Sequence, residues 1–186
     1  MAGNSFFQTV GLLFLEGSIR MSEAENLFGE EHIRRYRETD GEVGHIWRRG
    51  SKILLLTTKG RNTGERRTTP LIYEEAGDHH VIVASKGGAP EHPGWYRNLA
   101  KEPQVELQVK GEVFPARART ATGDERERLW KLAARQWPDY DEYQKKTDRE
   151  IPVVVLERGS SSSLTPNACP VAGAASPVKA KPTPGA

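Results

Sequence analysis

The sequence contains a single cysteine, Cys169, among its 186 residues. One cysteine cannot form an intramolecular disulfide or a multi-cysteine metal centre, so we expect a protein of a reducing, cytoplasmic compartment. Lys and Arg outnumber Asp and Glu only 27 to 25, which leaves a net charge of +2. Because so small a charge gives a weak overall field, we expect no general binding of nucleic acid, and any anion site must be local.

Several common catalytic motifs are also absent. The sequence has no G-x-G-x-x-G or G-x-x-x-x-G-K-[ST] segment, which removes support for the usual dinucleotide and P-loop sites. The five histidines lack metal-ligand spacing such as H-E-x-x-H, so no metal centre is expected. No G-x-S-x-G segment offers a serine nucleophile. A protein without these motifs can still be an enzyme if a cofactor supplies the reactive atom.

The two ends of the chain differ from its middle. The apolar run Val10–Leu15 is too short to span a bilayer, which takes about 20 residues. We expect residues 1–28 to be an N-terminal extension, with peripheral membrane contact as the alternative use of this strip. Residues 159–186 are rich in Ser, Pro, Ala and Gly and lack aromatics, which predicts a disordered tail. The folded domain is predicted over residues 29–158.

Within residues 29–158 the hydrophobic pattern changes from helical to strand-like. A helix is predicted from Gly29 to near Gly41, because Ile33 and Tyr36 recur at helical spacing among charged residues. Short runs rich in apolar and β-branched residues then predict six strands: 51–58, 67–75, 80–85, 104–109, 112–120 and 151–157.

Turn sequences between these runs indicate antiparallel pairing. Residues 76–79 and the pair Lys110 and Gly111 are typical of hairpin connections. Helices do not alternate with the strands as a parallel sheet requires. Thr122 to Glu125 match a capping box that starts a second helix. The sequence therefore predicts a mainly β protein, a small barrel with flanking helices.

One loop of this barrel, residues 59–70 (KGRNTGERRTTP), is strongly basic. Against the single acid Glu65 stand four basic residues: Lys59, Arg61, Arg66 and Arg67. Its glycines let the backbone approach a ligand closely, and arginine side chains with free backbone N–H groups form phosphate or carboxylate receptors. The loop therefore predicts an anion site, with a solvated basic turn as the alternative.

A second loop, residues 85–99 (SKGGAPEHPGWYRNL), combines a cation with large aromatics. Lys86 follows an apolar strand, two glycines permit close backbone approach, and the adjacent Trp95 and Tyr96 offer flat surfaces for a ring. An anion receptor beside an aromatic wall is the composition expected of a site for a phosphate-bearing aromatic cofactor.

Three blocks of the sequence resemble a known family. LLLTTKGRNTGERRTTPLIY, VIVASKGGAPEHPGWYRNL and WPDYDEYQKKTDREIPVVVLE closely resemble the deazaflavin-dependent nitroreductases of actinobacteria, the flavin/deazaflavin oxidoreductase A group. The resemblance covers about residues 33–157. It implies a split β-barrel of the FMN-binding type, and it implies coenzyme F420, a deazaflavin with a phosphate and an oligoglutamate tail.

The resemblance also implies roles for individual residues. The residues that match the family's grip on the phosphate and tail are Arg61, Asn62, Thr63, Gly64, Glu65 and Arg66. The residues that match the strand end and the cradle of the cofactor are Ser85, Lys86, Trp95, Tyr96 and Asn98.

Tyr140 and Tyr143 match tyrosines of the substrate pocket beside the deazaflavin ring and are the candidate catalytic residues. Trp137 stands where the nitroreductase has a further tyrosine, so nitroimidazole reduction does not follow from the resemblance. The alternative for these three aromatics is a helix that packs on the barrel.

The predicted function is hydride transfer from reduced F420 to an electron-poor small molecule, either a quinone, an enone or a nitroaromatic. Tyr140 is the candidate donor to the oxygen on which negative charge develops. The alternatives are a non-catalytic F420 carrier, an FMN-dependent oxidoreductase and, more distantly, a protein that binds single-stranded nucleic acid through Arg61, Arg66 and Trp95. The natural acceptor and the oligomeric state stay open at this point.

Overall fold

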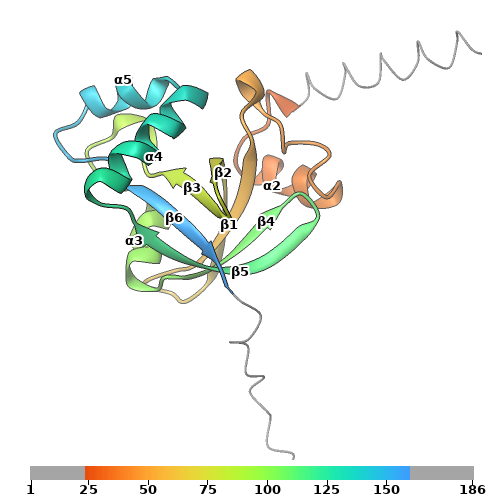
Figure 1. The fold of residues 1–186 in the computed structure, drawn as a ribbon. Coiled ribbons are helices and arrows are strands. Elements are labelled where there is room, and N and C mark those ends of the chain that lie inside the picture. The colour runs from red at the N-terminus through yellow and green to blue at the C-terminus, as the bar shows by residue number, and fades with distance from the viewer. Residues whose placement is uncertain (1–23, 160–186) are drawn as a thin grey trace, which may run out of the picture.

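The structure, a computed structural model, describes residues 24–159 (Figure 1). Most of the predicted N-terminal extension, Cys169 and nearly all of the predicted tail lie outside the described residues. Within them, six strands form a closed barrel in the order β1-β2-β3-β6-β5-β4, and every neighbouring pair is antiparallel. The predicted antiparallel barrel is therefore confirmed. Among residues 24–159, no helix combines the length and apolar character that crossing a membrane requires.

The strands follow the predicted runs, with ends that differ by no more than two residues. They are β1 (Ile53–Lys59), β2 (Arg66–Ala76), β3 (His79–Val83), β4 (Gln104–Val109), β5 (Glu112–Thr120) and β6 (Val153–Arg158). The helices are α2 (Gly29–Glu38), α3 (Gly94–Lys101), α4 (Gly123–Gln136) and α5 (Asp139–Lys145), with two 3₁₀ turns, η1 (Arg48–Gly50) and η2 (Lys86–Gly88).

Strand β1 is buried on both faces, which explains why its sequence does not alternate. Leu54 and Leu56 join the core inside the barrel. Leu55, between them, faces outward and packs against Ile33 and Tyr36 of α2. The helix predicted from Gly29 thus covers one side of the barrel.

Helices α4 and α5 cover another side of the barrel, over β3 and β6 (Figure 1). Val81 and Val155 pack against Leu129 of α4, and Val83 packs in a cluster with Tyr140 of α5. The barrel therefore has apolar residues outside as well as inside, and these outer clusters form the walls of the site described below.

Two local predictions are wrong. Residues 85–99 are not only a loop, because α3 begins at Gly94, and Trp95 and Leu99 of this helix join the barrel core. The capping box is also not formed: Thr122 lies at the N-cap of α4 without a side-chain hydrogen bond. The Glu125 carboxylate is instead held by the Arg119 guanidinium at 2.7 and 2.9 Å, a charge-assisted pair that outweighs a cap.

Candidate functional site

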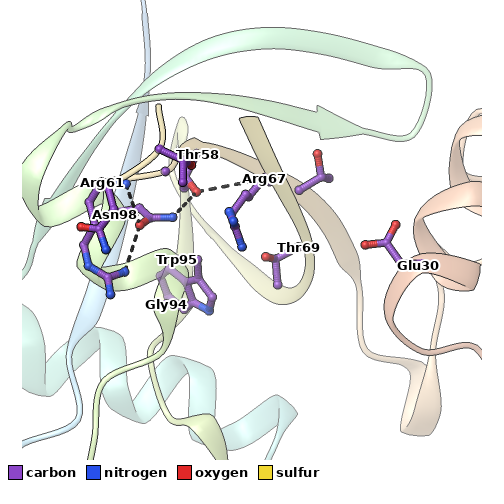
Figure 2. Close-up of a pocket in the computed structure, with 12 residues that line it drawn as sticks. Glu30, Thr58, Arg61, Arg67, Thr69, Gly94, Trp95 and Asn98 are labelled. Atoms are coloured by element: carbon purple, nitrogen blue, oxygen red, sulfur yellow. Dashed lines mark hydrogen bonds between the residues drawn. The ribbon is translucent and has the colours of Figure 1, made fainter. Parts of the chain in front are cut away.

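A polar pocket of about 500 Å³ lies between the β1–β2 turn and α3 (Figure 2). Its lining residues are Glu30, Thr58, Gly60, Arg61, Asn62, Thr63, Arg67, Thr68, Thr69, Gly94, Trp95 and Asn98. The pocket contains two guanidinium groups and several hydroxyl groups against one carboxylate. In Figure 2, Glu30 reaches in from α2 on the side away from Arg61. The lining therefore favours an anionic ligand.

The β1–β2 turn is fixed mainly by its own backbone. The Gly60 N–H donates to the Glu65 carbonyl at 2.7 Å, and the Gly64 N–H donates to the Gly60 carbonyl at 2.8 Å. Gly64 has a φ of +75°, a left-handed conformation that glycine adopts without strain. A Cβ at Gly60 would lie 3.0 Å from Thr63 Oγ1. These glycines are therefore needed for the turn itself.

Asn98 ties α3 to this turn. Its Oδ1 accepts hydrogen bonds from the backbone N–H of Arg61 at 3.2 Å and from Arg61 Nη1 at 3.3 Å, and its Nδ2 donates to Thr58 Oγ1 at 3.2 Å (Figure 2). Asn98 is only 4% exposed. With its amide engaged in this way, Asn98 orients Arg61 at the pocket.

The two neighbouring arginines at the start of β2 point to opposite sides of the strand. Arg67 lines the polar pocket, whereas Arg66 forms an ion pair with Glu106 of β4 and lines a separate depression that also contains Gly64. Side chains alternate along a strand, so the side chains of these two adjacent arginines point to opposite faces of the sheet. Alternation alone does not say which of the two arginines faces the pocket, and the place of β2 in the barrel decides it.

Glu65 is exposed and lies beside the turn. Its carboxylate accepts a hydrogen bond from Thr63 at 3.3 Å and lies 3.5 Å from Arg67 Nη2. Of the residues predicted to grip a phosphate and tail, the structure brings Arg61, Asn62 and Thr63 together in the polar pocket. It places Gly64, Glu65 and Arg66 outside that lining.

A second, largely apolar pocket of about 460 Å³ adjoins the first. It is lined by Leu27, Phe28, Gly29, His32, Trp47, Ile53, Thr69, Pro70, Leu71, Ile72, Val83, Ser85, Lys86, Gly87, Pro93, Trp95, Trp137, Tyr140 and Tyr143. Thr69 and Trp95 line both pockets. The two pockets therefore meet at Trp95, and together they offer an anion receptor that continues into an aromatic chamber.

Tyr140 is a buried polar residue of the apolar pocket. It is 6% exposed, and its ring lies edge-on to Tyr143 with centroids 6.3 Å apart. Within residues 24–159 its hydroxyl has no hydrogen-bond partner. Burial, with smaller contributions from Tyr143 and Glu74, raises the pKa of Tyr140 above its ordinary value. The phenol is therefore protonated at neutral pH and able to donate to a ligand.

Aromatic residues from outside the predicted loops complete this pocket. Trp47, which precedes β1, stacks on Trp137 at 5.8 Å with an interplanar angle of 20°. Its Nε1 is buried without a hydrogen-bond partner among the described residues. His32 of α2 contacts the Gly44 carbonyl through Nε2 at 2.8 Å, and burial lowers its pKa. No sequence signal points to Trp47 or His32, since neither lies in a motif.

Of the remaining predicted cofactor residues, two line the apolar pocket and one lies outside both pockets. Ser85 and Lys86 line the apolar pocket, and the Lys86 ammonium pairs with Glu91 at 3.1 Å. Tyr96 lines neither pocket: its hydroxyl lies 3.1 Å from Thr120 Oγ1, and its ring packs on His92.

The residues present fit the deazaflavin cofactor that the sequence implies. The polar pocket provides the Arg61 and Arg67 guanidinium groups and threonine hydroxyls for an acidic chain. The aromatic surface that begins at Trp95 and leads to Tyr140 suits a flat ring. The two features lie in adjoining pockets that share Thr69 and Trp95, as a ligand with an anionic tail and a planar head requires.

Comparison with known proteins gives the same result. The family model for F420H(2)-dependent quinone reductase matches residues 29–158. An F420H(2)-dependent quinone reductase of Mycobacterium tuberculosis strain H37Rv is 42% identical over 130 residues, which cover 68% of this chain and 87% of the relative. The reductase of the same name from strain CDC 1551 is equally similar.

Two solved structures share the fold. An F420-H2 dependent reductase (FDR-A) is 47% identical, with a TM-score of 0.53 over 56% of this chain and 93% of the other. A structure described as a domain-swapped dimer is 43% identical, with a TM-score of 0.56 over 69% of this chain and 95% of the other. The predictions of a split barrel, an oxidoreductase and the cofactor F420 are confirmed. The chain belongs to the F420H(2)-dependent quinone reductase family.

Proposed function

We propose that this protein binds reduced F420 across the two pockets and transfers a hydride to a quinone in the apolar pocket. When bound, the reduced deazaflavin supplies the hydride. The observation that carries the proposal is the junction at Trp95 between a pocket with two arginines and a pocket with an unpartnered buried phenol. The family membership supports the choice of cofactor and acceptor.

The residues of the polar pocket bind and orient. The Arg61 and Arg67 guanidinium groups bind the anionic chain of the cofactor through charge-assisted hydrogen bonds. Asn98 and the β1–β2 turn hold Arg61 in place before the ligand arrives. Preorganised donors lose little conformational freedom on binding, which favours affinity.

The residues of the apolar pocket exclude water and hold a proton. Trp47, Trp137 and Ile72 surround the acceptor with apolar surface, which strengthens any hydrogen bond formed inside. Tyr140 donates its hydroxyl proton to the acceptor oxygen, where negative charge develops as the hydride arrives. The Tyr140 hydroxyl is available for this because no protein group competes for it within residues 24–159.

The test is an anaerobic assay in which menadione is the acceptor for reduced F420. Oxidation of reduced F420 is monitored by the return of the deazaflavin absorbance. The enzyme accelerates the reaction in proportion to protein concentration, and the same protein after heat denaturation serves as control. Binding of reduced F420 without its oxidation would favour the carrier. Binding of FMN and of F420 is measured by tryptophan fluorescence. Tight binding of FMN without binding of F420 would favour an FMN-dependent oxidoreductase.

The acceptor is the finer part of the proposal. A quinone carbonyl, an enone carbonyl and a nitro group can each accept a hydrogen bond from Tyr140, and the same assay compares them at equal concentration. We propose the quinone as preferred acceptor on family grounds. A higher kcat/KM for an enone or a nitroaromatic would replace it.

We also propose a cytoplasmic protein that touches the membrane surface. Phe28, which lines the apolar pocket, is 55% exposed, and the Arg48 guanidinium lies 4.7 Å from its ring centroid. An exposed aromatic beside a cation suits an anionic lipid interface. Flotation of the full chain with phosphatidylglycerol vesicles tests this, and recovery of all protein in the bottom fraction would contradict it.

A further inference from the structure

Arg149, between α5 and β6, directs its guanidinium at the main chain of a single loop. Its Nε donates to the Ala89 carbonyl at 2.9 Å, and its Nη2 donates to the Ser85 carbonyl at 2.8 Å and the Ala84 carbonyl at 3.3 Å. Its Nη1 lies 3.3 Å from His92 Nδ1. One side chain therefore holds both ends of the turn that contains η2.

That turn has a conformation that needs support. Lys86, Gly87 and Gly88 have φ values of +49°, +65° and +83°, so three consecutive residues are left-handed. Glycine tolerates this region, but for Lys86 it is unfavourable. Unfavourable backbone persists only where the surroundings fix it. The carbonyl groups on both sides of these three residues are the ones that Arg149 holds.

The same turn packs directly on α5. A Cβ at Gly88 would lie 2.7 Å from the Tyr143 carbonyl oxygen and 2.9 Å from Lys146 Cβ, so no larger residue fits there. Gln144 of α5 in turn donates to the Arg149 carbonyl at 2.9 Å. Arg149 thus joins the turn that carries Ser85 and Lys86 to the helix that carries Tyr140 and Tyr143.

We propose that Arg149 is a positioning residue that locks the turn of residues 85–89 against α5 and thereby fixes Ser85 and Lys86 on the wall of the apolar pocket. The expected effect of Arg149 on turnover and F420 affinity rests on the proposed function. The contact requires arginine, because the planar guanidinium serves three carbonyl groups at fixed angles, whereas a lysine ammonium cannot reproduce that fork.

The first experiment needs no ligand. Lys86 is a trypsin site, and limited proteolysis of the native full chain with mass spectrometry follows cleavage between Lys86 and Gly87. Arg149→Gln should raise that cleavage rate by roughly tenfold or more, because local opening governs proteolysis of a folded protein. Arg149→Lys keeps the charge but should also raise the rate of cleavage after Lys86. This variant is used if Arg149→Gln is too unstable to purify.

Arg119→Gln is the matched control. Arg119 is also a partly buried arginine, and it donates to the Glu157 carboxylate at 2.6 Å and to the Glu125 carboxylate at 2.7 and 2.9 Å, partners that belong neither to the η2 turn nor to the segment around Arg149. Its loss should lower the thermal stability without a selective rise in cleavage after Lys86. An equal rise in both variants would overturn the proposal, because the effect would then be general loosening.

The second experiment is a double-mutant cycle with Lys86→Ala. If Arg149 acts through the turn, Arg149→Gln should lower kcat/KM by roughly 10-fold to 100-fold alone and by much less when Lys86 is already alanine. The F420 dissociation constant, measured by tryptophan fluorescence, should show the same non-additivity. Additive effects of the two substitutions, or faster cleavage with unchanged kinetics and affinity, would overturn the positioning role.

If the wild-type chain fails to oxidise reduced F420, the proposed function fails. The cleavage rate and the F420 dissociation constant would still test whether Arg149 holds the turn of residues 85–89 against α5.

Discussion

The polar and apolar pockets adjoin at Trp95 but are built in different ways. The polar pocket is formed mostly by one hairpin, from Thr58 to Thr69, with support from α3. The apolar pocket draws residues from α2, the segment before β1, β2, η2, α3 and α5. The anion receptor is therefore largely a local structure, whereas the aromatic chamber exists only after the whole barrel has folded. Substitutions in the two should separate affinity from turnover.

The largest effect is expected from Tyr140→Phe in the apolar pocket. Loss of the buried Tyr140 phenol donor should lower kcat by about 100-fold, the usual consequence of removing one donor to a developing negative charge. The F420 dissociation constant should change by no more than about twofold, because affinity resides in the charge-assisted contacts of the other pocket. Stopped-flow kinetics and a fluorescence titration measure the two quantities.

Tyr143→Phe is the comparison variant, since Tyr143 shares the helix but is only half-buried. Its turnover should fall less than that of Tyr140→Phe. Equal losses of turnover and cofactor affinity in Tyr140→Phe would contradict the assignment of affinity to the polar pocket and of turnover to the apolar pocket.

The second effect separates two arginines of the polar hairpin. Arg61→Ala should weaken F420 binding by about 1.5–3 kcal/mol, because it removes a charge-assisted contact. Arg66→Ala should weaken it far less, since Arg66 is paired with Glu106 outside the pocket lining. Titration of both variants with F420 gives the answer. A larger loss in the Arg66 variant would place the acidic chain in the other depression.

The third effect is a pH dependence of stability that arises from His32, which lines the apolar pocket. Burial lowers the pKa of His32 from its ordinary value of 6.5. As the pH falls through that value the unfolded chain gains a proton before the folded one, so the free energy of unfolding decreases towards acid. Urea unfolding between about pH 7.5 and about pH 5.5 measures the slope.

His32→Gln should flatten part of that slope, although His45, His80 and His92, whose pKa values burial also lowers, keep the rest. No histidine lines the polar pocket. An unchanged slope in His32→Gln would contradict a lowered pKa of His32, because it would mean that the folded and unfolded chains bind the same number of protons at this side chain over the range.

The smallest effect is expected from Tyr96→Phe. The Tyr96 hydroxyl contacts Thr120 and lies outside both pockets. Its removal should lower the stability by no more than about 1 kcal/mol, the usual net value of one hydrogen bond. The F420 affinity should stay within about twofold, the size expected for a surface change. A tenfold loss of affinity would instead support the predicted role of Tyr96 in holding the cofactor.

The strands were predictable because they depend on alternation and turns. The runs before and after Lys110 show this, and the structure reproduces both limits. The same logic failed at Gly94, where three glycines and two prolines in residues 85–99 concealed a short helix. The helix α3 is stabilised by the burial of Trp95 and Leu99 in the barrel core, a tertiary effect that local propensity does not contain.

The polar pocket was also predictable as a basic loop, but its lining was not. The sequence places Arg61, Arg66 and Arg67 within seven residues, and only strand register decides that Arg67 faces the pocket. Trp47 was beyond prediction for a different reason. It reaches the apolar pocket by stacking on Trp137, ninety positions further along the chain.

The sequence by itself determined an antiparallel barrel with a basic, glycine-containing hairpin, because strand alternation, turn residues and local charge are all short-range properties. The tertiary structure alone decided which arginine lines the anion receptor, that Tyr140 lies buried with a free hydroxyl, and that Arg149 holds the turn beside it. These depend on which side of each element meets its neighbours, and that is fixed only when the barrel closes and its outer helices pack on it.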